Sequence, residues 1–138
     1  MMDRAYEKGV IPYCQEHNIG FVAFSPIASG YLSGKVDPNQ TFTGDDVRQW
    51  VPQLKKENML ANRPLLEVLP DMAARKHATN AQITLAWMLR KYPHVVPIPG
   101  SKNKGRILEN LGAWEVELTD GEFQELEDAF PHLTAKER

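Results

Sequence analysis

The order of strand-like and helical segments constrains the fold of this chain most. Residues 21–24 form a short apolar segment that Pro26 stops, and residues 95–98 form a second, β-branched segment that Pro99 closes. Both segments suit buried strands, and helical spacing dominates between and around them. Strands that alternate with helices pair in parallel. The sequence therefore predicts an α/β fold whose ligands gather at the carboxyl ends of the strands.

Several segments carry helical periodicity or the signals of a helix start. They are residues 5–17, 65–76, 79–92, 104–113 and a final helix that begins at 119. The third and the last of these segments begin with capping boxes, at Thr79 to Gln82 and at Thr119 to Glu122. Pro70 predicts either a kink in the second helix or its start. Residues 33–62 mix Gly, Pro, Asp and Asn with isolated aromatics, which predicts a long loop with one or two helical turns inside a single unit over 1–138.

Length and net charge limit the fold and the partners that this chain can have. A chain of 138 residues suffices for one domain, whereas a complete (β/α)8 barrel needs at least about 200. The net charge of −2 gives no bias toward polyanions, so we expect no nucleic-acid partner. No apolar run is as long as a membrane span, and the start lacks the apolar core of a signal peptide. We therefore expect a cytoplasmic protein without a membrane partner.

Metal-ligating side chains are sparse in the sequence. None of the four histidines stands three or four residues from another, and Cys14 is the single cysteine. This pattern lacks the ligand spacing of a metal site and permits no internal disulfide. We expect neither a bound metal nor a disulfide.

Residues 98–110, IPGSKNKGRILEN, combine a strand end, a turn and a helix start. Ser101 or Asn103 can cap that helix, and Lys102, Lys104 and Arg106 lie in its first turns. Backbone N–H groups, the positive end of the helix dipole and cationic side chains converge there, as a phosphate site requires. The same spacing is also typical of an ordinary strand, turn and helix with a solvated basic face.

Two motifs in order are similar to one family. The run at 98–110 resembles the segment of the aldo-keto reductases, which are (β/α)8 barrels, that grips the 2′-phosphate of NADPH. Residues 20–35, GFVAFSPIASGYLSGK, resemble the seventh strand of that family and its pyrophosphate loop. The resemblance runs from Asp3 to about Phe130 and corresponds to the C-terminal part of the barrel alone. It implies a partial (β/α)8 barrel with parallel strands and covering helices.

The resemblance implies NADP as the cofactor and assigns its contacts. The family positions that wrap the nicotinamide end and the pyrophosphate are matched by Ser25, Ile27, Ser29 and Leu32. Phe24 matches the aromatic on which the nicotinamide stacks, with a plain barrel residue as the alternative. Ser101, Lys102 and Arg106 match contacts of the 2′-phosphate, which favours NADPH over NADH. The implied cofactor-binding residues are Phe24, Ser25, Pro26, Ile27, Ser29, Gly30, Leu32, Lys35, Gly100, Ser101, Lys102, Arg106, Glu109 and Asn110.

No catalytic residue transfers from the family to this chain. The family passes a hydride to a carbonyl carbon with the help of a Tyr, Lys, Asp and His that lie on the first half of its barrel. Tyr6, Tyr13, Tyr31 and Tyr92 stand in no context that resembles the catalytic tyrosine. The opening residues resemble the stretch that follows the family's sixth strand, as though the chain began within a longer protein.

Three hypotheses follow. The chain is the NADP-binding C-terminal portion of an aldo-keto reductase, inactive alone and active in carbonyl reduction as part of the complete enzyme. Alternatively, it is a free-standing partial barrel that binds a nucleotide or regulates without catalysis, and its open sheet edges would then require a homo-oligomer. In the third hypothesis it completes a barrel with a separately encoded N-terminal half.

Overall fold

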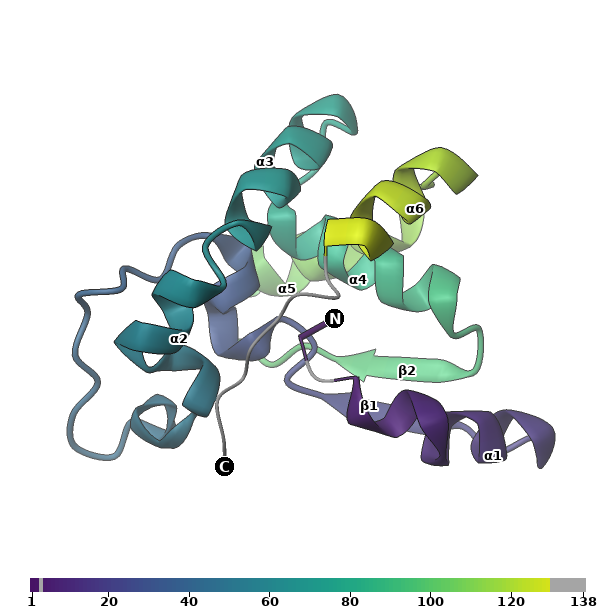
Figure 1. Cartoon of the computed structure of the whole chain (residues 1–138), viewed down its shortest axis with the longest axis horizontal. Coiled ribbons are helices and arrows are strands. Elements are labelled where there is room, and N and C mark those ends of the chain that lie inside the picture. Colours follow the sequence, from purple (N-terminus) through teal and green to yellow (C-terminus); the bar gives the residue numbers. More distant parts are fainter. Residues whose placement is uncertain (3, 130–138) are drawn as a thin grey trace.

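The computed structural model describes residues 1–2 and 4–129, so Asp3 and Phe130, the two ends of the resembling stretch, lie outside the described residues. Its centre is a parallel sheet of two strands, β1 (Phe21–Phe24) and β2 (Val95–Ile98). Phe21 pairs with Val95 and Phe24 with Ile98. The helices α4 (Asn80–Lys91) and α6 (Asp120–Ala129) lie above the strands, α1 (Val10–Glu16) lies beside β1, and α2 (Lys56–Ala61) stands at the opposite end (Figure 1). Both predicted strands and their parallel pairing are confirmed.

Helices account for most of the remaining elements. The α-helices are α1 (Val10–Glu16), α2 (Lys56–Ala61), α3 (Leu65–Arg75), α4 (Asn80–Lys91), α5 (Lys104–Leu111) and α6 (Asp120–Ala129). The 3-10 helices are η1 (Ala5–Lys8), η2 (Ala28–Ser33), η3 (Val47–Trp50), η4 (Pro52–Leu54) and η5 (Gly112–Glu115). Among the described residues, no helix combines the length and apolar character needed to cross a membrane.

Both predicted capping boxes form. The Thr79 hydroxyl accepts from the Gln82 N–H, and the Gln82 side chain accepts from the Thr79 N–H at 2.8 Å, at the start of α4. The Glu122 carboxylate accepts from the Thr119 N–H at 2.7 Å at the start of α6. Side-chain acceptors satisfy N–H groups that the first helical turn leaves free, so these residues set where the helices begin.

Three sequence predictions need refinement. The segment 33–62 is less loop-like than expected, because it holds η3, η4 and α2. The predicted helix over 5–17 is divided at Gly9 into η1 and α1, and α1 begins two residues before Pro12, where the missing proline N–H costs nothing. Pro70 does not set the start of α3, which begins five residues earlier and continues through it.

The core lies on one side of the sheet, around α4. Trp87 is fully buried there, as its position on the apolar stripe predicts, and its ring contacts those of Tyr92 and Phe123. Leu69 and Met72 of α3 and Leu126 of α6 are also fully buried in this cluster. Apolar burial of this kind is the main stabilising contribution to a small domain.

Charged groups join the N-terminal segment to this packed side. The Arg4 guanidinium donates to Glu7 at 2.8 Å and to Glu127 of α6 at 2.9 Å, and Lys91 of α4 also pairs with Glu127. Burial alone would raise the pKa of Glu127, but hydrogen bonds from Lys91 and Arg4 hold it below its ordinary value. The network therefore links η1, α4 and α6 while these carboxylates stay ionised.

The other face of the sheet is bare. Val22, Phe24, Val96 and Ile98 point away from α4, and more than half of each side chain is exposed. In a closed barrel the side chains of this face fill the interior. The architecture is thus a partial barrel, with one face of its sheet covered by helices and the other open.

Candidate functional site

The two motifs meet at one end of the sheet. Phe24 ends β1 and pairs with Ile98, which ends β2. Because the strands are parallel, the loop that starts at Ser25 and the turn that starts at Pro99 leave the sheet side by side. This is the edge at which ligands bind in parallel α/β folds.

The loop after β1 is unusually strained. Ser25, Ala28 and Ser29 have φ of 47°, 49° and 53°, a region that residues with a Cβ rarely adopt. Gly30 follows at 97°, where glycine is free of that penalty. Strain of this kind gathers at ligand sites, and successive turns of opposite hand point backbone N–H groups into an anion-binding concavity. The loop geometry fits a phosphate-binding role.

Packing against the core holds this loop in place. Tyr31 is almost fully buried, and its hydroxyl donates to the Met59 carbonyl of α2 at 2.8 Å. Burial raises the pKa of Tyr31 to about 12, so the hydroxyl keeps its proton. Gly34, at φ 73°, lies so near α4 that an added Cβ would be 3.0 Å from the Asn80 amide nitrogen. The loop is therefore fixed by contacts on both sides.

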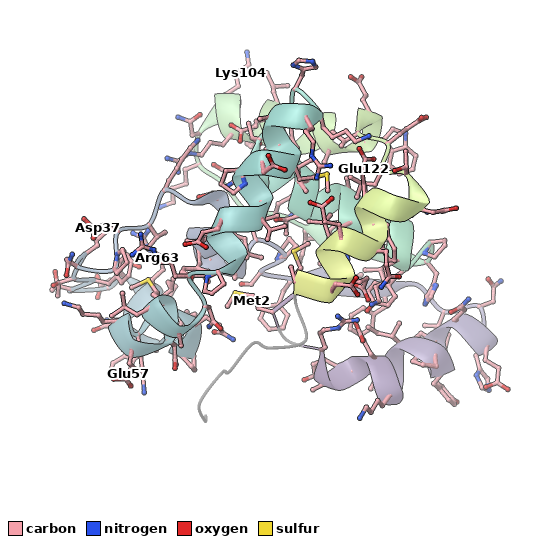
Figure 2. The ribbon with its side chains drawn as sticks, turned by 45° about the horizontal axis from the view of Figure 1, so that its top comes forward. Met2, Asp37, Glu57, Arg63, Lys104 and Glu122 are labelled. Carbon is pink, nitrogen blue, oxygen red and sulfur yellow. The ribbon has the colours of Figure 1, made fainter. Side chains whose placement is uncertain are left out.

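The turn after β2 starts α5 with its own cap. The Asn103 side chain accepts from the Arg106 N–H at 3.1 Å, and the Ser101 hydroxyl accepts from the Asn103 N–H at 3.1 Å. Lys102 and Arg106 are exposed, and Lys104 points outward at the periphery (Figure 2). Within the part of the chain that the structure describes, these cations enter no ion pair.

The groups around the start of α5 suit an anionic ligand. Lys102 and Arg106 carry charge that no carboxylate among the described residues neutralises, next to the positive end of α5. Glu109 and Asn110 lie half-buried in the same helix. An arginine can contact two phosphate oxygens at once, while a lysine acts as a point charge. The donor set can therefore hold an anionic group such as a phosphate.

A cavity of about 480 Å³ opens beside the loop, lined in part by Phe24, Ser25 and Ser29. Phe24 is 79% exposed in this chain, so its ring is open to a ligand, and in a closed barrel the same ring would face the interior. Trp50, which sequence reasoning did not select, lines the same cavity and is 78% exposed. The one feature of the sequence that could have pointed to Trp50 is that an aromatic residue stands in a segment rich in Gly, Pro and Asp. Among the described residues, none of 99–110 lines this cavity.

The other residues predicted to contact the cofactor differ in position, and Pro26 and Leu32 line the same cavity as Phe24. Lys35 lines a second cavity, of about 520 Å³, with Asp37 and Arg63, which lie near one another at one edge of the molecule (Figure 2). Pro26 and Leu32 are buried, so their side chains pack into the protein and only their backbone is available to a ligand. Gly100 is exposed in the turn, with open space around its Cα.

Tyr31, which is buried, and Tyr92, which is half-buried, are engaged in structural contacts. The Tyr92 hydroxyl donates to the Glu7 carboxylate, and burial together with that carboxylate raises the pKa of Tyr92. Tyr6 and Tyr13 are exposed, and Tyr13 stacks on the His17 ring of the same helix. Among the described residues, no group of three or more His, Cys, Asp or Glu comes together as metal ligands would.

Comparisons with known proteins agree on one family. The aldo/keto reductase family model matches residues 1–130. Over 123 residues the chain is 34% identical to the aldo-keto reductase yakc of Schizosaccharomyces pombe, whose name specifies NADP(+). It is 33% identical over 128 residues to the probable aldo-keto reductase 1 of Glycine max. The matches cover 89% and 93% of this chain but only 36% and 37% of these relatives.

Solved structures agree on the fold. A glycerol dehydrogenase from Gluconobacter oxydans matches with a TM-score of 0.80 at 24% identity, over 99% of this chain and 41% of its own. A thermostable aldo-keto reductase, solved with the inhibitor epalrestat, matches with a TM-score of 0.61 at 26% identity, over 92% of this chain and 36% of its own. Both are (β/α)8 barrels of which this chain spans a part. The chain belongs to the aldo/keto reductase family.

Proposed function

We propose that this chain forms the NADP(H)-binding C-terminal portion of an aldo-keto reductase barrel, and that the complete barrel reduces aldehydes or ketones. One observation carries the proposal. The register that pairs Phe24 with Ile98 puts the strained loop and the basic turn at the same end of the sheet. The choice of cofactor is supported by the yeast relative, whose name includes NADP(+).

The two segments take different parts in binding. The backbone at Ser25 to Gly30 holds the pyrophosphate end, and the exposed ring of Phe24 stacks on the nicotinamide. Lys102, Arg106 and the Ser101 hydroxyl hold the 2′-phosphate, and Glu109 with Asn110 contacts the adenine. Pro26, Ile27, Leu32, Lys35 and Gly100 complete the proposed set. Bound NADPH supplies the hydride for carbonyl reduction.

In this proposal the chain supplies binding and orientation, and the proton donor for the carbonyl comes from the part of the barrel that the chain does not span. Tyr31 and Tyr92 donate to Met59 and Glu7, so neither hydroxyl is available at the cavity. We therefore propose that the isolated chain does not turn over substrate. A cytoplasmic location also stays a prediction, which cell fractionation tests.

A free-standing nucleotide-binding module is the second candidate. It is favoured by one observation, that both the strained loop and the cap of α5 form from residues of this chain alone. The two candidates share the site but differ in catalysis. The first requires the remaining barrel for activity, whereas the second predicts binding without any reductase partner.

Calorimetric titration with NADPH and NADH tests the shared site. We expect NADPH to bind at least about tenfold more tightly, because charge-assisted hydrogen bonds to phosphate contribute about 1.5–3 kcal/mol each. Arg106→Ala should remove most of that preference. Lys8→Ala, which deletes an exposed cation at the other end of β1, is the matched control. Equal binding of both cofactors, or none by the unsubstituted chain, would contradict the proposal.

A further inference from the structure

Asn62 is a buried polar residue at the C-terminal end of α2. It lies on the same face of that helix as Asn58 and Met59, and the three residues are only 2–3% exposed. The Asn58 amide donates to the Pro52 carbonyl at 2.7 Å, and the Met59 carbonyl accepts from the Tyr31 hydroxyl. Within the described residues, by contrast, neither polar atom of the Asn62 side chain has a hydrogen-bond partner.

A buried amide without partners costs free energy. It offers two donors and one acceptor, and in the unfolded chain water satisfies all of them. Neither amide atom of Asn62 is open to water, and the side chain is enclosed by this chain itself, so a segment from outside the chain cannot reach it either. A partner for the Asn62 amide must therefore come from a rearrangement of its neighbours within the chain.

The second cavity gives those neighbours room to move. This cavity of about 520 Å³ lies between residues 34–38 and residues 59–67, and Met59 and Arg63, on either side of Asn62 in the sequence, both line it. Asp37 and Arg63 lie near one another there (Figure 2). Gly34, at φ 73°, separates the fixed cofactor loop from residues 35–38. Because glycine tolerates many backbone conformations, it can act as the hinge of this segment.

Lys35 lies on this segment and is free to leave the second cavity. Arg63 of the same cavity pairs with Glu67 at 3.9 Å, whereas Lys35 enters no ion pair in the described part of the chain. The Lys35 N–H is held only by a long hydrogen bond of 3.3 Å to the Ser33 hydroxyl. To serve as the cofactor contact proposed above, the Lys35 ammonium has to turn from this cavity to an anionic group beside the cofactor loop.

We propose that Asn62 is a positioning residue for Lys35. When the cofactor binds, the Lys35 ammonium turns to the pyrophosphate, residues 36–38 close on α2, and the Asn62 amide donates to a peptide carbonyl of that segment. The hydrogen bond that the free chain lacks then favours the bound arrangement. The inference rests on the proposed function and adds to it a residue that does not itself touch the cofactor.

Calorimetric titration of Asn62→Leu tests the inference. The substitution removes the amide and nearly keeps its volume. It should weaken NADPH and NADH alike, by about tenfold, because one hydrogen bond is lost and both cofactors carry the pyrophosphate. Lys35→Met should also weaken both cofactors. Adding Asn62→Leu to it should cause less than about twofold further loss, because the two residues act through one arrangement.

The stability of the free chain should respond in a different way. Asn62→Leu removes an amide without partners, so its thermal midpoint should equal that of the unsubstituted chain or exceed it. Asn58→Leu is the matched control, on the same face and equally buried. It leaves the Pro52 carbonyl without its donor, so its midpoint should fall by about 2–4 °C. Its affinity for NADPH should stay within about twofold, because Asn58 takes no part in the proposed arrangement.

NMR of the unsubstituted chain decides even where a variant does not fold. When NADPH is added, the side-chain amide protons of Asn62 should shift downfield and exchange with water at least about tenfold more slowly, as newly bonded protons do. Those of Asn58, already bonded to Pro52, should keep their shifts and exchange rates.

Three results would overturn the inference alone. They are NADPH affinity that Asn62→Leu leaves unchanged, a thermal midpoint of Asn62→Leu as low as that of Asn58→Leu, and Asn62 amide protons that do not respond to bound NADPH. The second would identify Asn62 as a packing residue. Failure of the unsubstituted chain to bind either cofactor would instead overturn the proposed function, and this inference with it.

Discussion

The helices α4 and α5 flank the same strand, yet they meet opposite surroundings. Seven residues of α4 are buried, whereas none of α5 is. Ile107, Leu108 and Leu111 of α5 are 43%, 57% and 67% exposed although all three are apolar. The buried residues of α4 pack against other parts of this same chain, including α3. We infer that α5 is fixed chiefly by its cap and its neighbour α4, and that its apolar side belongs to an interface with the rest of a barrel.

Replacing Trp87 in α4 should have the largest effect on stability. Trp87→Ala removes a fully buried ring and its hydrogen bond to Glu127, 2.8 Å long. Large-to-small changes of this kind cost about 3–5 kcal/mol. Urea unfolding measures the loss. Trp114→Ala, beyond α5, is the control, because Trp114 is 80% exposed. Equal losses of stability for the two variants would show that the core around α4 and the exposed surface beyond α5 contribute equally.

The contact between the two helices gives a smaller effect. A Cβ at Gly112, which follows α5, would lie 2.6 Å from the Gln82 amide nitrogen. Gly112→Ala should therefore displace Gln82 from its capping box with Thr79 and cost about 1–2 kcal/mol. Gly121→Ala in α6, where no heavy atom lies within 4 Å, should be neutral or slightly stabilising. Thermal unfolding compares the pair, and equal midpoints would refute the contact.

Low pH should weaken the contact between the end of α3 and the start of α6. The Lys76 ammonium, 2.6 Å from the Glu122 carboxylate, and the Thr119 N–H lower the pKa of Glu122 to about 2. A carboxyl whose pKa is lowered in the folded state stabilises the fold at pH values above its ordinary pKa of 4.5. That stabilisation is lost as the pH falls from 4.5 toward 2. The pair is partly solvated, so we expect about 1 kcal/mol.

Urea unfolding between pH 7 and pH 3 measures this change. Glu122→Gln should remove it, because the amide does not titrate. Glu57→Gln on α2, an exposed carboxylate (Figure 2), should leave the pH dependence as it is. Identical pH profiles for Glu122→Gln and the unsubstituted chain would count against the ion pair.

The smallest effect on stability is expected at the exposed apolar residues of α5. Leu111→Gln changes an apolar side chain of α5 that is 67% exposed. Surface changes of this kind usually alter stability by less than about 0.5 kcal/mol. Chemical unfolding of the isolated chain at several concentrations measures it. A loss near that of Trp87→Ala would mean that Leu111 is buried in solution, against another copy of the chain.

The sequence predicts the periodic parts of this fold well. The β-branched run at Val95, the apolar stripe around Trp87 and the Thr79 capping box rest on local chemistry, and each lies where predicted. The strained φ of Ala28 could not be foreseen, because neighbouring packing imposes a conformation that alanine disfavours. Lys35 was placed by similarity with its neighbours and stays a proposed contact, and the sequence did not indicate that the turn at Gly34 would put it beside a second cavity.

The central claim is that the loop after β1 and the turn before α5 form one cofactor site. Amide spectra of the labelled chain, recorded with NADH and then with NADPH, test it most directly. Both cofactors should shift residues 24–35. Only NADPH, through its 2′-phosphate, should further shift Ser101, Lys102 and Arg106. Shifts in one segment without the other, or a difference between the cofactors that lies outside α5 and its turn, would contradict the claim.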